Sequence, residues 1–211
     1  MEIIYLDSID STHKYLKDYI KKYSYTKPLA IIAESQTNGI GSRDNSWNGK
    51  FGNIFLSFVI DKELLPKDLP IQSASIYFSY ILKEILYNNG SKVWIKWPND
   101  FYLNDKKIGG TITNLNNNLI YCGIGLNLNF ISSEYGILDI KIDKKIILKQ
   151  YLNNIMAQIP WKQIFSKYLL EFNKSKLFKA TINNQKISLK NTKLNDDGSI
   201  IIDNKRVYSL R

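Results

Sequence analysis

The chain has 211 residues, of which 44 % are hydrophobic, enough to bury the core of one domain of ordinary size plus a small appendage. A single cysteine, Cys122, excludes an intramolecular disulfide, and no segment reaches the roughly eighteen apolar residues of a membrane-spanning helix, so we expect a soluble cytoplasmic protein with no membrane partner. The net charge of +10 is spread over lysines from Lys14 to Lys205, with only three arginines and no recognition motif, which argues against DNA as a partner.

The first expected elements are a strand over Ile3–Leu6 and an amphipathic helix that begins near Asp10-Ser11-Thr12. Apolar side chains recur there at helical spacing: Tyr15, Leu16, Tyr19, Ile20 and Tyr23. The hydroxyls of Ser11 and Thr12 suit a helix N-cap, and the free N–H groups of a helix start also suit a ligand, so both roles stay open. His13 has no cysteine or clustered carboxylates at metal-ligand spacing, so we expect a polar residue at the helix start and not a metal ligand.

A strand of buried type, Leu29–Glu34, leads into a loop from Gln36 to Trp47 that contains Gly39-Ile40-Gly41. These glycines begin a glycine-rich fingerprint, but neither its last glycine nor the Lys-Ser/Thr of a P-loop follows. A dinucleotide-binding or Walker-type fold is therefore not supported. A strand over Asn53–Ile60 and an amphipathic helix over Ile71–Leu86 come next, and we expect both to contribute core residues.

The run from Lys96 to Gly110 gathers charged, aromatic, amide and glycine residues into one predicted hairpin. Pro98 cannot donate a hydrogen bond to a neighbouring strand, so the strand that enters at Val93 ends here. The hairpin has two short strands and a polar turn: Phe101–Leu103, Asn104-Asp105-Lys106 and Ile108–Ile112. A rigid sheet would hold its polar side chains still, which suits chemistry: Lys96, Asn99, Asp100 and Lys107.

The rest of the chain predicts one more buried strand, two helices and a segment of short strands. Leu119–Leu128 is the strand, in which Cys122 is expected to be a buried, inert thiol. Asp143–Asn173 is typical of a helical region that is broken near Pro160. Leu177–Arg211 changes to short strands separated by turns.

Four stretches together resemble the biotin protein ligase (biotin-[carboxylase] ligase) family. The most specific is Lys96-Trp97-Pro98-Asn99-Asp100, followed by Lys107 and by Gly109-Gly110. The other three come in the family's order: Asp10-Ser11-Thr12-His13, the segment 33–47, and Gly123-Ile124-Gly125-Leu126-Asn127-Leu128-Asn129. Because the four span roughly residues 7 to 130, a chance match of all of them is very improbable.

The resemblance implies an α+β fold, with a class II aminoacyl-tRNA synthetase/biotin ligase-like mixed β-sheet packed with helices. Residues 1–175 would form the catalytic domain, and residues 176–211 a small C-terminal SH3-like β domain, although that segment is short for such a barrel. The chain starts directly at the ligase region, so we expect a monofunctional enzyme without the winged helix that makes some members repressors.

The activity implied is ATP-dependent ligation of biotin, through biotinyl-5'-AMP, to a lysine of a biotin carboxyl carrier domain. The partner would be the carrier protein of acetyl-CoA carboxylase or a similar carboxylase, and biotin, ATP and Mg2+ would be required. Homodimer formation stays open. Two alternatives remain: a lipoate or octanoate transferase of the same fold, which the Lys-Trp-Pro-Asn-Asp sequence disfavours, and a non-catalytic module that binds biotin or biotinyl-adenylate.

The family's functional positions map onto this sequence as follows. Biotin would contact Ser11, Thr12, His13, Gln36, Gly39, Ile40, Gly41, Ser42, Lys107 and Gly110. ATP and the adenylate would contact Arg43, Trp47, Lys96, Asn99, Lys107 and Asn127, although Asn127 alone is equally typical of a turn. Catalysis would depend on Lys107, Lys96 and Arg43. Asp100 is either a magnesium ligand or an acceptor that orients the turn and the lysines.

The loop departs from the family's Gly-Arg-Gly-Arg-Arg-Gly pattern. Ile40 and Ser42 stand at arginine positions, Asp44 replaces a glycine and Asn45 another cation, which leaves Arg43 alone. A reactive acyl-adenylate is retained by charge-assisted bonds to its phosphate and by exclusion of water. We therefore expect a loop that closes over the ligand but retains the adenylate less firmly, and this departure is what suggests the non-catalytic alternative.

Overall fold

The computed structural model describes residues 1–41, 46–47, 50–129, 131–182 and 185–208, and these form helices packed on a mixed sheet. The helices are α1 (Thr12–Tyr23), α2 (Ala74–Asn88), α3 (Lys144–Met156) and α4 (Trp161–Ser175), with 3-10 turns at Lys62–Leu64 and Ile71–Ser73. The strands are β1 (Glu2–Ile9), β2 (Leu29–Gln36), β3 (Gly39–Ile40), β4 (Ser46–Trp47), β5 (Ile54–Asp61), β6 (Trp94–Lys96), β7 (Asp100–Leu103), β8 (Lys106–Asn116), β9 (Leu119–Leu126), β10 (Lys179–Ile182), β11 (Gln185–Ser188), β12 (Ile200–Ile202) and β13 (Lys205–Val207).

Within the described residues the main sheet has seven strands in the order β1-β2-β5-β9-β8-β7-β6. Strands β1 and β2 are parallel, and α1 forms the crossover between them, whereas all other neighbours are antiparallel. The predicted α+β class is confirmed. The predicted hairpin is the β7–β8 pair, and Asn104, with φ of 51°, lies in its turn.

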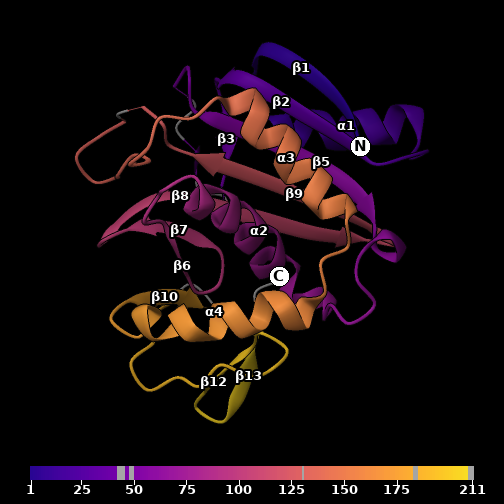
Figure 1. Ribbon diagram of the computed structural model, residues 1–211. Coiled ribbons are helices and arrows are strands. Elements are labelled where there is room, and N and C mark those ends of the chain that lie inside the picture. Colours follow the sequence, from indigo (N-terminus) through magenta and orange to yellow (C-terminus); the bar gives the residue numbers. More distant parts are fainter. Residues whose placement is uncertain (42–45, 48–49, 130, 183–184, 209–211) are drawn as a thin grey trace.

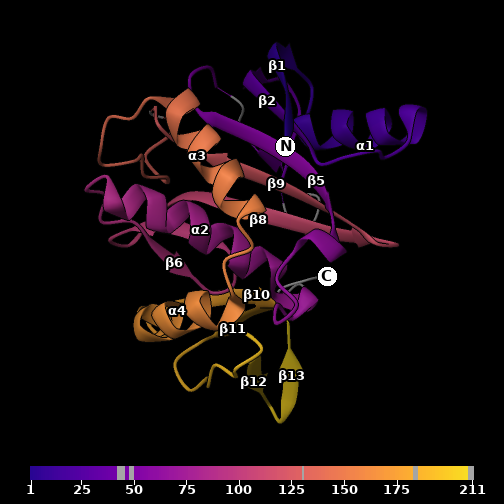
Figure 2. The ribbon, with the colours of Figure 1, turned by 45° about the vertical axis from the view of Figure 1, so that its right-hand side comes forward.

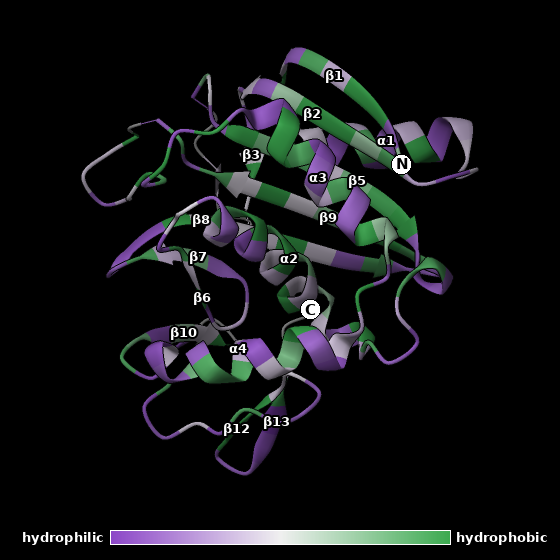
Figure 3. Cartoon of the chain, in the orientation of Figure 1, coloured by the Kyte–Doolittle hydropathy of each residue, from purple (hydrophilic) through white to green (hydrophobic). Residues whose placement is uncertain are grey.

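Helices cover both faces of this sheet because the central strands are apolar on both sides. Figures 1 and 2 show α2 and α3 together on one side and α1 on the other. In β2, Ala30 and Ile32 belong to the core cluster beneath α2 and α3, whereas Leu29 and Ile31 pack with Leu16 of α1. Figure 3 shows hydrophobic residues along β2 and β5 in the middle of the sheet. A cavity lies on the α1 side, where Ser11, Thr12 and His13 at the start of α1 line it.

Helix α4 lies beside strand β6 at the sheet edge, with the C-terminal hairpins β10–β11 and β12–β13 next to it (Figure 1). Its first turn is capped from a distant loop, since Asp68 accepts hydrogen bonds from the N–H groups of Trp161 and Lys162, both at 3.0 Å. Ala180 and Ile200 of the hairpins share the main core cluster with Trp161 and Phe172 of α4. The C-terminal segment is therefore packed onto the ligase-like sheet through α4.

Element boundaries differ from the sequence predictions by a few residues at the ends. The strand predicted over Leu119–Leu128 ends at Leu126, and the first helix after Asp143 ends at Met156, where Gln158 adopts a positive φ of 51°. After Leu126, the Asn127 N–H donates to the Ile108 oxygen of β8 and the Asn127 oxygen accepts from the Leu138 N–H. After Met156, Pro160 is two residues beyond Gln158 and cannot continue the helix. Cys122 is fully buried, as predicted.

Candidate active site

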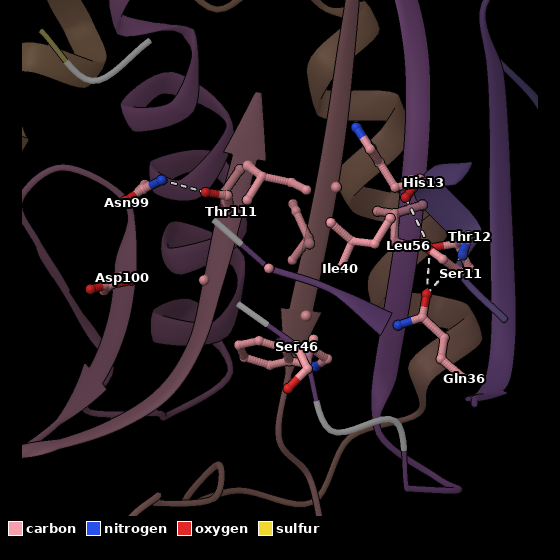
Figure 4. Close-up of a pocket in the computed structure, with 18 of the residues that line it drawn as sticks. Ser11, Thr12, His13, Gln36, Ile40, Ser46, Leu56, Asn99, Asp100 and Thr111 are labelled. Carbon is pink, nitrogen blue, oxygen red and sulfur yellow. Dashed lines mark hydrogen bonds between the residues drawn. The ribbon is translucent and has the colours of Figure 1, made fainter. Parts of the chain in front are cut away.

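A cavity of about 640 Å³ opens on the α1 side of the sheet, a volume suited to a small-molecule ligand. Its floor is formed by β5, β8 and β9, its one end by the start of α1 and the end of β2, and its other end by the β6–β7 turn. Figure 4 shows Ser11, Thr12 and Gln36 on one side of this cavity and Asn99 and Asp100 on the opposite side. The cavity therefore has two polar ends joined by a less polar middle.

At the α1 end, Thr12 fixes the side chain of Gln36. The Thr12 backbone N–H donates to Gln36 Oε1 at 2.8 Å, and Thr12 Oγ1 lies 3.0 Å from the same oxygen and 2.9 Å from Ser57 Oγ (Figure 4). Ser11 is the N-cap of α1, and its Oγ accepts from the N–H of Lys14 at 3.4 Å. Because these hydroxyls and the amide are almost fully buried or held by neighbours, this end presents a fixed set of hydrogen-bonding groups.

His13 lies beside this end as a buried, neutral side chain. Burial lowers the pKa of His13 to about 4, helped by the charge of Lys17. Its Nε2 lies 3.1 Å from Asn114 Oδ1, an oxygen that also accepts from Lys17 Nζ at 3.5 Å. Because Lys17 can only donate, the Asn114 atom that faces it is the acceptor oxygen and not the amide nitrogen. The His13 Nε2 that contacts the same oxygen must therefore carry a proton and donate it. His13 is thus a polar helix-start residue, as predicted, and a wall of the cavity.

The glycine loop places a short hairpin over the cavity. Gly39 and Ile40 in β3 pair with Trp47 and Ser46 in β4. A Cβ at Gly39 would lie 2.7 Å from Gln36 Nε2 and from the Trp47 carbonyl oxygen, so only glycine fits there. Ile40 and Gly41 line the cavity, whereas Ser42 and Arg43 lie outside the described residues.

The indole of Trp47 lies on the backbone of Gly125 in β9. A Cβ at Gly125 would come within 2.4 Å of Trp47 Cε2. Trp47 Nε1 is buried and has no hydrogen-bond partner in the part of the chain that the structure describes. The glycine in β9 thus makes room for the aromatic ring that closes this side of the cavity.

The opposite end holds a chain of three charged groups in which one carboxylate lies between two ammonium groups. Asp100 Oδ1 lies 2.6 Å from Lys107 Nζ, and Asp100 Oδ2 lies 3.2 Å from Lys96 Nζ. Burial opposes ionisation of Asp100, but Lys107 and Lys96 outweigh it and hold the pKa of this carboxyl below its usual range. Burial also disfavours the charged form of Lys107, yet Asp100 keeps the pKa of this ammonium above its usual value. The end carries one net positive charge.

Glycine and amide groups keep this charged chain in place. A Cβ at Gly110 would lie 3.3 Å from Asp100 Oδ1, so the glycine leaves room for the ion pair. Asn99 is bonded twice to Thr111 of β8: its backbone oxygen accepts from the Thr111 N–H at 3.0 Å, and its Nδ2 donates to the Thr111 oxygen (Figure 4). The peptide bond between Trp97 and Pro98 is cis. Lys96 is 8 % exposed, contacts Asp100 and is not part of the described lining of this cavity.

A second cavity, of about 610 Å³, adjoins the first on the other side of the β3–β4 hairpin. Gly39 and Asn127 line it, and Gln36 and Trp47 are shared between both cavities. Asn127 Nδ2 donates to the Gly136 oxygen at 3.2 Å, whereas its buried Oδ1 has no hydrogen-bond partner among the described residues. The second cavity thus contains an amide whose donor side is satisfied and whose acceptor oxygen is not.

The described residues around the first cavity offer few ligands for a magnesium ion. Among the described residues no three His, Cys, Asp or Glu side chains group as a metal site, and Asp100 is the one carboxylate on the wall of the first cavity. Both of its oxygens already contact lysines. Asp100 therefore fits the orienting role better than that of a principal metal ligand, with phosphate oxygens supplying the remaining ligands.

Several cavity residues were not predicted from the sequence. Ser57 carried a signal, because it is a lone hydroxyl within the apolar strand Ile54–Asp61. Tyr135, Thr181 and Lys186 carried none, since they come from a loop and from the β10–β11 hairpin, which reach the cavity only through the tertiary fold. The C-terminal segment therefore contributes a lysine to the same cavity as the ligase-like motifs.

The model of the biotin/lipoate A/B protein ligase family matches residues 5–129 of this chain. This match covers more than half of the sequence and includes all the described residues that line the first cavity except Tyr135, Thr181 and Lys186. The chain belongs to the biotin/lipoate A/B protein ligase family. No helix in the described ranges has the length and apolar composition to cross a membrane.

Within this family, the bifunctional ligase/repressor BirA of Escherichia coli (strain K12) is 35 % identical over 130 residues, which are 58 % of this chain and 39 % of BirA. Biotin–protein ligase 2 of Arabidopsis thaliana is 30 % identical over 108 residues, 46 % of this chain and 32 % of that protein. The chain thus spans less than half the length of these two relatives.

Solved structures extend the match to nearly the whole chain. Biotin acetyl coenzyme A carboxylase synthetase from Helicobacter pylori, determined with bound biotinylated ATP, has a TM-score of 0.92 and 38 % identity, and the match covers 98 % of this chain and 99 % of that one. The Aquifex aeolicus biotin protein ligase in complex with biotin and ATP has a TM-score of 0.71 at 22 % identity, covering 100 % and 96 %. The second likeness supports the fold alone, and the first also supports the biotin branch of the family.

Proposed function

We propose that this protein activates biotin with ATP and ligates it to a lysine of a biotin carboxyl carrier domain. The observation that carries the proposal is one cavity with two different polar ends. The Ser11–Thr12–Gln36 end offers fixed neutral hydrogen-bonding groups. The other end has Lys107 and Asp100 on the cavity wall, and the buried Lys96, which is outside the described lining, pairs with Asp100. Biotin has a neutral ureido ring at one end and a carboxylate at the other, which matches this polarity.

The neutral end suits the ureido ring because its groups are already oriented. Gln36 Oε1 is occupied by two contacts from Thr12, so the amide N–H groups of Gln36 remain for a ligand carbonyl. The hydroxyls of Ser11 and Ser57 can each donate or accept. Burial keeps His13 neutral, so this end of the cavity has no histidine charge beside the neutral ureido ring.

The charged end suits the first chemical step. The biotin carboxylate must attack the α-phosphate of ATP, so two anions approach each other and fixed positive charge lowers the barrier. Lys107 is our candidate for the cation that bridges carboxylate and phosphate, with Lys96 on further phosphate oxygens. Mg2+ bound to the ATP phosphates would supply further positive charge, and Asp100 would orient the two lysines. The attack would break the bond between the α- and β-phosphates, release pyrophosphate and form the mixed anhydride biotinyl-5'-AMP. The neutral amine of the carrier lysine would then attack the carbonyl carbon of this anhydride, form the amide and release AMP and a proton.

The second cavity suits the adenosine part of ATP. Trp47 forms a wall shared by both cavities, and its indole offers an aromatic surface for adenine. The free acceptor oxygen of Asn127 would accept from the amino group of adenine after a small side-chain movement. The β3–β4 hairpin between the cavities would cover the adenylate and exclude water.

The remaining parts of the proposal concern organisation. Residues 1–175 would be the catalytic domain and residues 176–211 a small C-terminal β domain of SH3-like type. The partner of the whole protein would be the carrier domain of acetyl-CoA carboxylase or a similar carboxylase. The reaction would take place in the cytoplasm. A homodimer is compatible with this proposal but is not required by it, because one chain supplies both cavities.

A second candidate is a module that binds biotin or its adenylate without catalysis. Ile40 favours this candidate, because it is an apolar residue, 44 % exposed, on the hairpin that covers the cavity, at a position where the family resemblance implies an arginine. Without that charge the hairpin would stabilise the reacting phosphate less. The two candidates differ in the consumption of ATP. A binding module would hold biotin at the neutral end without releasing pyrophosphate.

The test is biotin-dependent release of pyrophosphate from MgATP by the wild-type protein, Lys107→Ala and Lys106→Ala. Lys106 is the matched control, because it is the neighbouring exposed lysine and its Nζ contacts only the Ser133 oxygen, at 3.2 Å, among the contacts described. We expect release by the wild type and Lys106→Ala and a loss of at least about a hundredfold in Lys107→Ala. Equal release by both variants would contradict the role of Lys107, and no release by the wild type would contradict the ligase.

A further inference from the structure

Strand β6, which carries Lys96, is the last strand of the main sheet, so one of its edges has no neighbouring strand among the residues that the structure describes. On its inner side β6 pairs with β7, through Trp94 with Tyr102 and Lys96 with Asp100. Ile95 and Trp97 are two residues apart, so their N–H groups point to the same, outer edge. Unpaired N–H groups on a buried edge are costly and leave the strand free to shift.

Two side chains of α4 fill this edge. Glu171 Oε1 accepts from the Ile95 N–H at 3.2 Å, and Ser175 Oγ accepts from the Trp97 N–H at 3.0 Å. Glu171 and Ser175 are four residues apart on one face of the helix, a rise of about 6 Å, which matches the spacing of about 7 Å between alternate strand residues. Helix α4 therefore replaces the missing strand with two side-chain acceptors, and Figure 1 shows it beside β6.

Both acceptors are themselves held in place. Glu171 Oε2 lies 3.3 Å from Lys83 Nζ of α2, and Lys83 also lies 3.2 Å from Glu84. Ser175 is fully buried. Trp97, also fully buried, donates its indole N–H to the Gly198 oxygen of the C-terminal segment at 3.0 Å. The backbone on each side of Lys96 is thus fixed to α2, to α4 and to the C-terminal segment.

We propose that Glu171 and Ser175 are positioning residues for the reaction, because they hold the backbone on either side of Lys96 and so set the Lys96–Asp100–Lys107 chain. This inference rests on the proposed function, since it assigns Lys96 and Lys107 to the phosphate. Neither residue lines the first cavity among the described residues, and neither would touch a substrate. Their effect is transmitted through the two N–H groups and the strand.

The test compares Ser175→Ala with the wild type in biotin-dependent pyrophosphate release and in biotin binding. Ser175→Ala removes the acceptor of the Trp97 N–H with little change in volume. We expect kcat to fall about tenfold or more, because a small misplacement of reacting groups is costly. KM for biotin should change less than about twofold, because the neutral end of the cavity is built from β2, β5 and α1.

Three further variants separate positioning from stability. Ile155→Val removes one methylene from the fully buried core of α3 and should lower Tm without lowering kcat. The Ser166 hydroxyl of α4 donates to the Gln163 oxygen of its own helix, the one hydrogen bond described for it. Ser166→Ala should therefore leave Tm and kcat unchanged. Glu171→Gln keeps an acceptor for the Ile95 N–H but loses the charge that pairs with Lys83, so it should retain more kcat than Glu171→Ala although both lose stability.

Two results would overturn the inference. One is a Ser175→Ala protein that is folded at the assay temperature and keeps the wild-type kcat. The other is a fall in kcat that Ile155→Val reproduces at the same loss of Tm. If the wild-type protein binds biotin and ATP but releases no pyrophosphate, the proposed function fails separately. The inference is then decided by the Kd for ATP, which Ser175→Ala must weaken about tenfold, and an unchanged Kd would refute it.

Discussion

Asp100 Oδ1 lies 2.6 Å from Lys107 Nζ, so the cation assigned to the reacting carboxylate and phosphate is already paired with a protein carboxylate. Gly110 lies against this pair, because a Cβ at residue 110 would lie 3.3 Å from Asp100 Oδ1 and 3.5 Å from Lys107 Nζ. An arriving phosphate would offer Lys107 a second anion in the same place. Asp100 thus keeps the lysine charged and oriented in the absence of substrate.

The first prediction concerns the alkaline side of the pH–rate profile. Asp100 raises the pKa of Lys107, so in the wild type this ammonium stays protonated as the pH rises beyond the ordinary lysine range. Asp100→Asn removes that support while burial still disfavours the charge, so the pKa of Lys107 must fall. We expect the alkaline limb of kcat to move to lower pH by about one unit or more. An alkaline limb at the same pH in both proteins would show that Lys107 does not titrate in the reaction.

The second prediction concerns acid stability. Burial lowers the pKa of His13 to about 4, whereas the unfolded chain has a histidine of ordinary pKa, about 6.5. Above pH 6.5 His13 is neutral in both the folded and the unfolded chain. As the pH falls from 6.5 toward 4, only the unfolded chain takes up the proton, so the free energy of unfolding decreases. Between pH 7 and pH 5 the wild type should lose about 2 kcal/mol more unfolding free energy than His13→Asn, measured by urea denaturation. Parallel losses would contradict a neutral buried His13.

The third prediction tests the contact between Trp47 and Gly125. A Cβ at Gly125 would come within 2.4 Å of the indole, so Gly125→Ala should cost about 1–3 kcal/mol of unfolding free energy or displace the ring. In a Trp47→Ala background the same change should cost much less, because the ring that it meets is gone. A double-mutant cycle in urea measures this coupling. Additive costs would show that the ring does not lie on Gly125.

The fourth prediction concerns the lysine contributed by the C-terminal hairpin. Lys186 lines the first cavity, and the segment 36–47 contains a single arginine, Arg43. We expect Lys186→Ala to raise KM for ATP several-fold and to speed escape of the adenylate, because one cation near the phosphates is removed. Lys190→Ala, an exposed lysine of the same segment, is the control. Equal kinetics for the two variants would exclude a phosphate contact by Lys186.

Many of the motif residues meet in one cavity because they lie on or beside regular elements, and their contacts with biotin and ATP stay predictions. The Lys-Trp-Pro-Asn-Asp run ends one strand and begins the next, so the sequence spacing places Lys96 and Asp100 opposite each other in the β6–β7 pair. Ser11 and Thr12 are at the helix start that their residue types predict. Gln36 was found only through the resemblance, since a single glutamine at the end of a strand has no distinctive pattern.

What the sequence could not predict depends on long-range packing. Glu171 and Ser175 lie on a helix whose apolar period indicates only a buried face, and nothing in that period shows that two polar side chains meet the edge of β6. Lys186 is one lysine among many until the hairpin is placed against the cavity. The predicted contacts of Ser42 and Arg43 lie outside the described residues and stay predictions.

The most direct test of the proposed ligase is transfer of biotin to an isolated biotin carboxyl carrier domain, followed by the intact mass of that domain. We expect a single biotin addition that requires both ATP and biotin, that is absent with a carrier whose acceptor lysine is replaced by arginine, and that Lys107→Ala abolishes while Lys106→Ala does not. An unmodified carrier after incubation with wild-type protein that binds biotin tightly would contradict the ligase and leave a binding module.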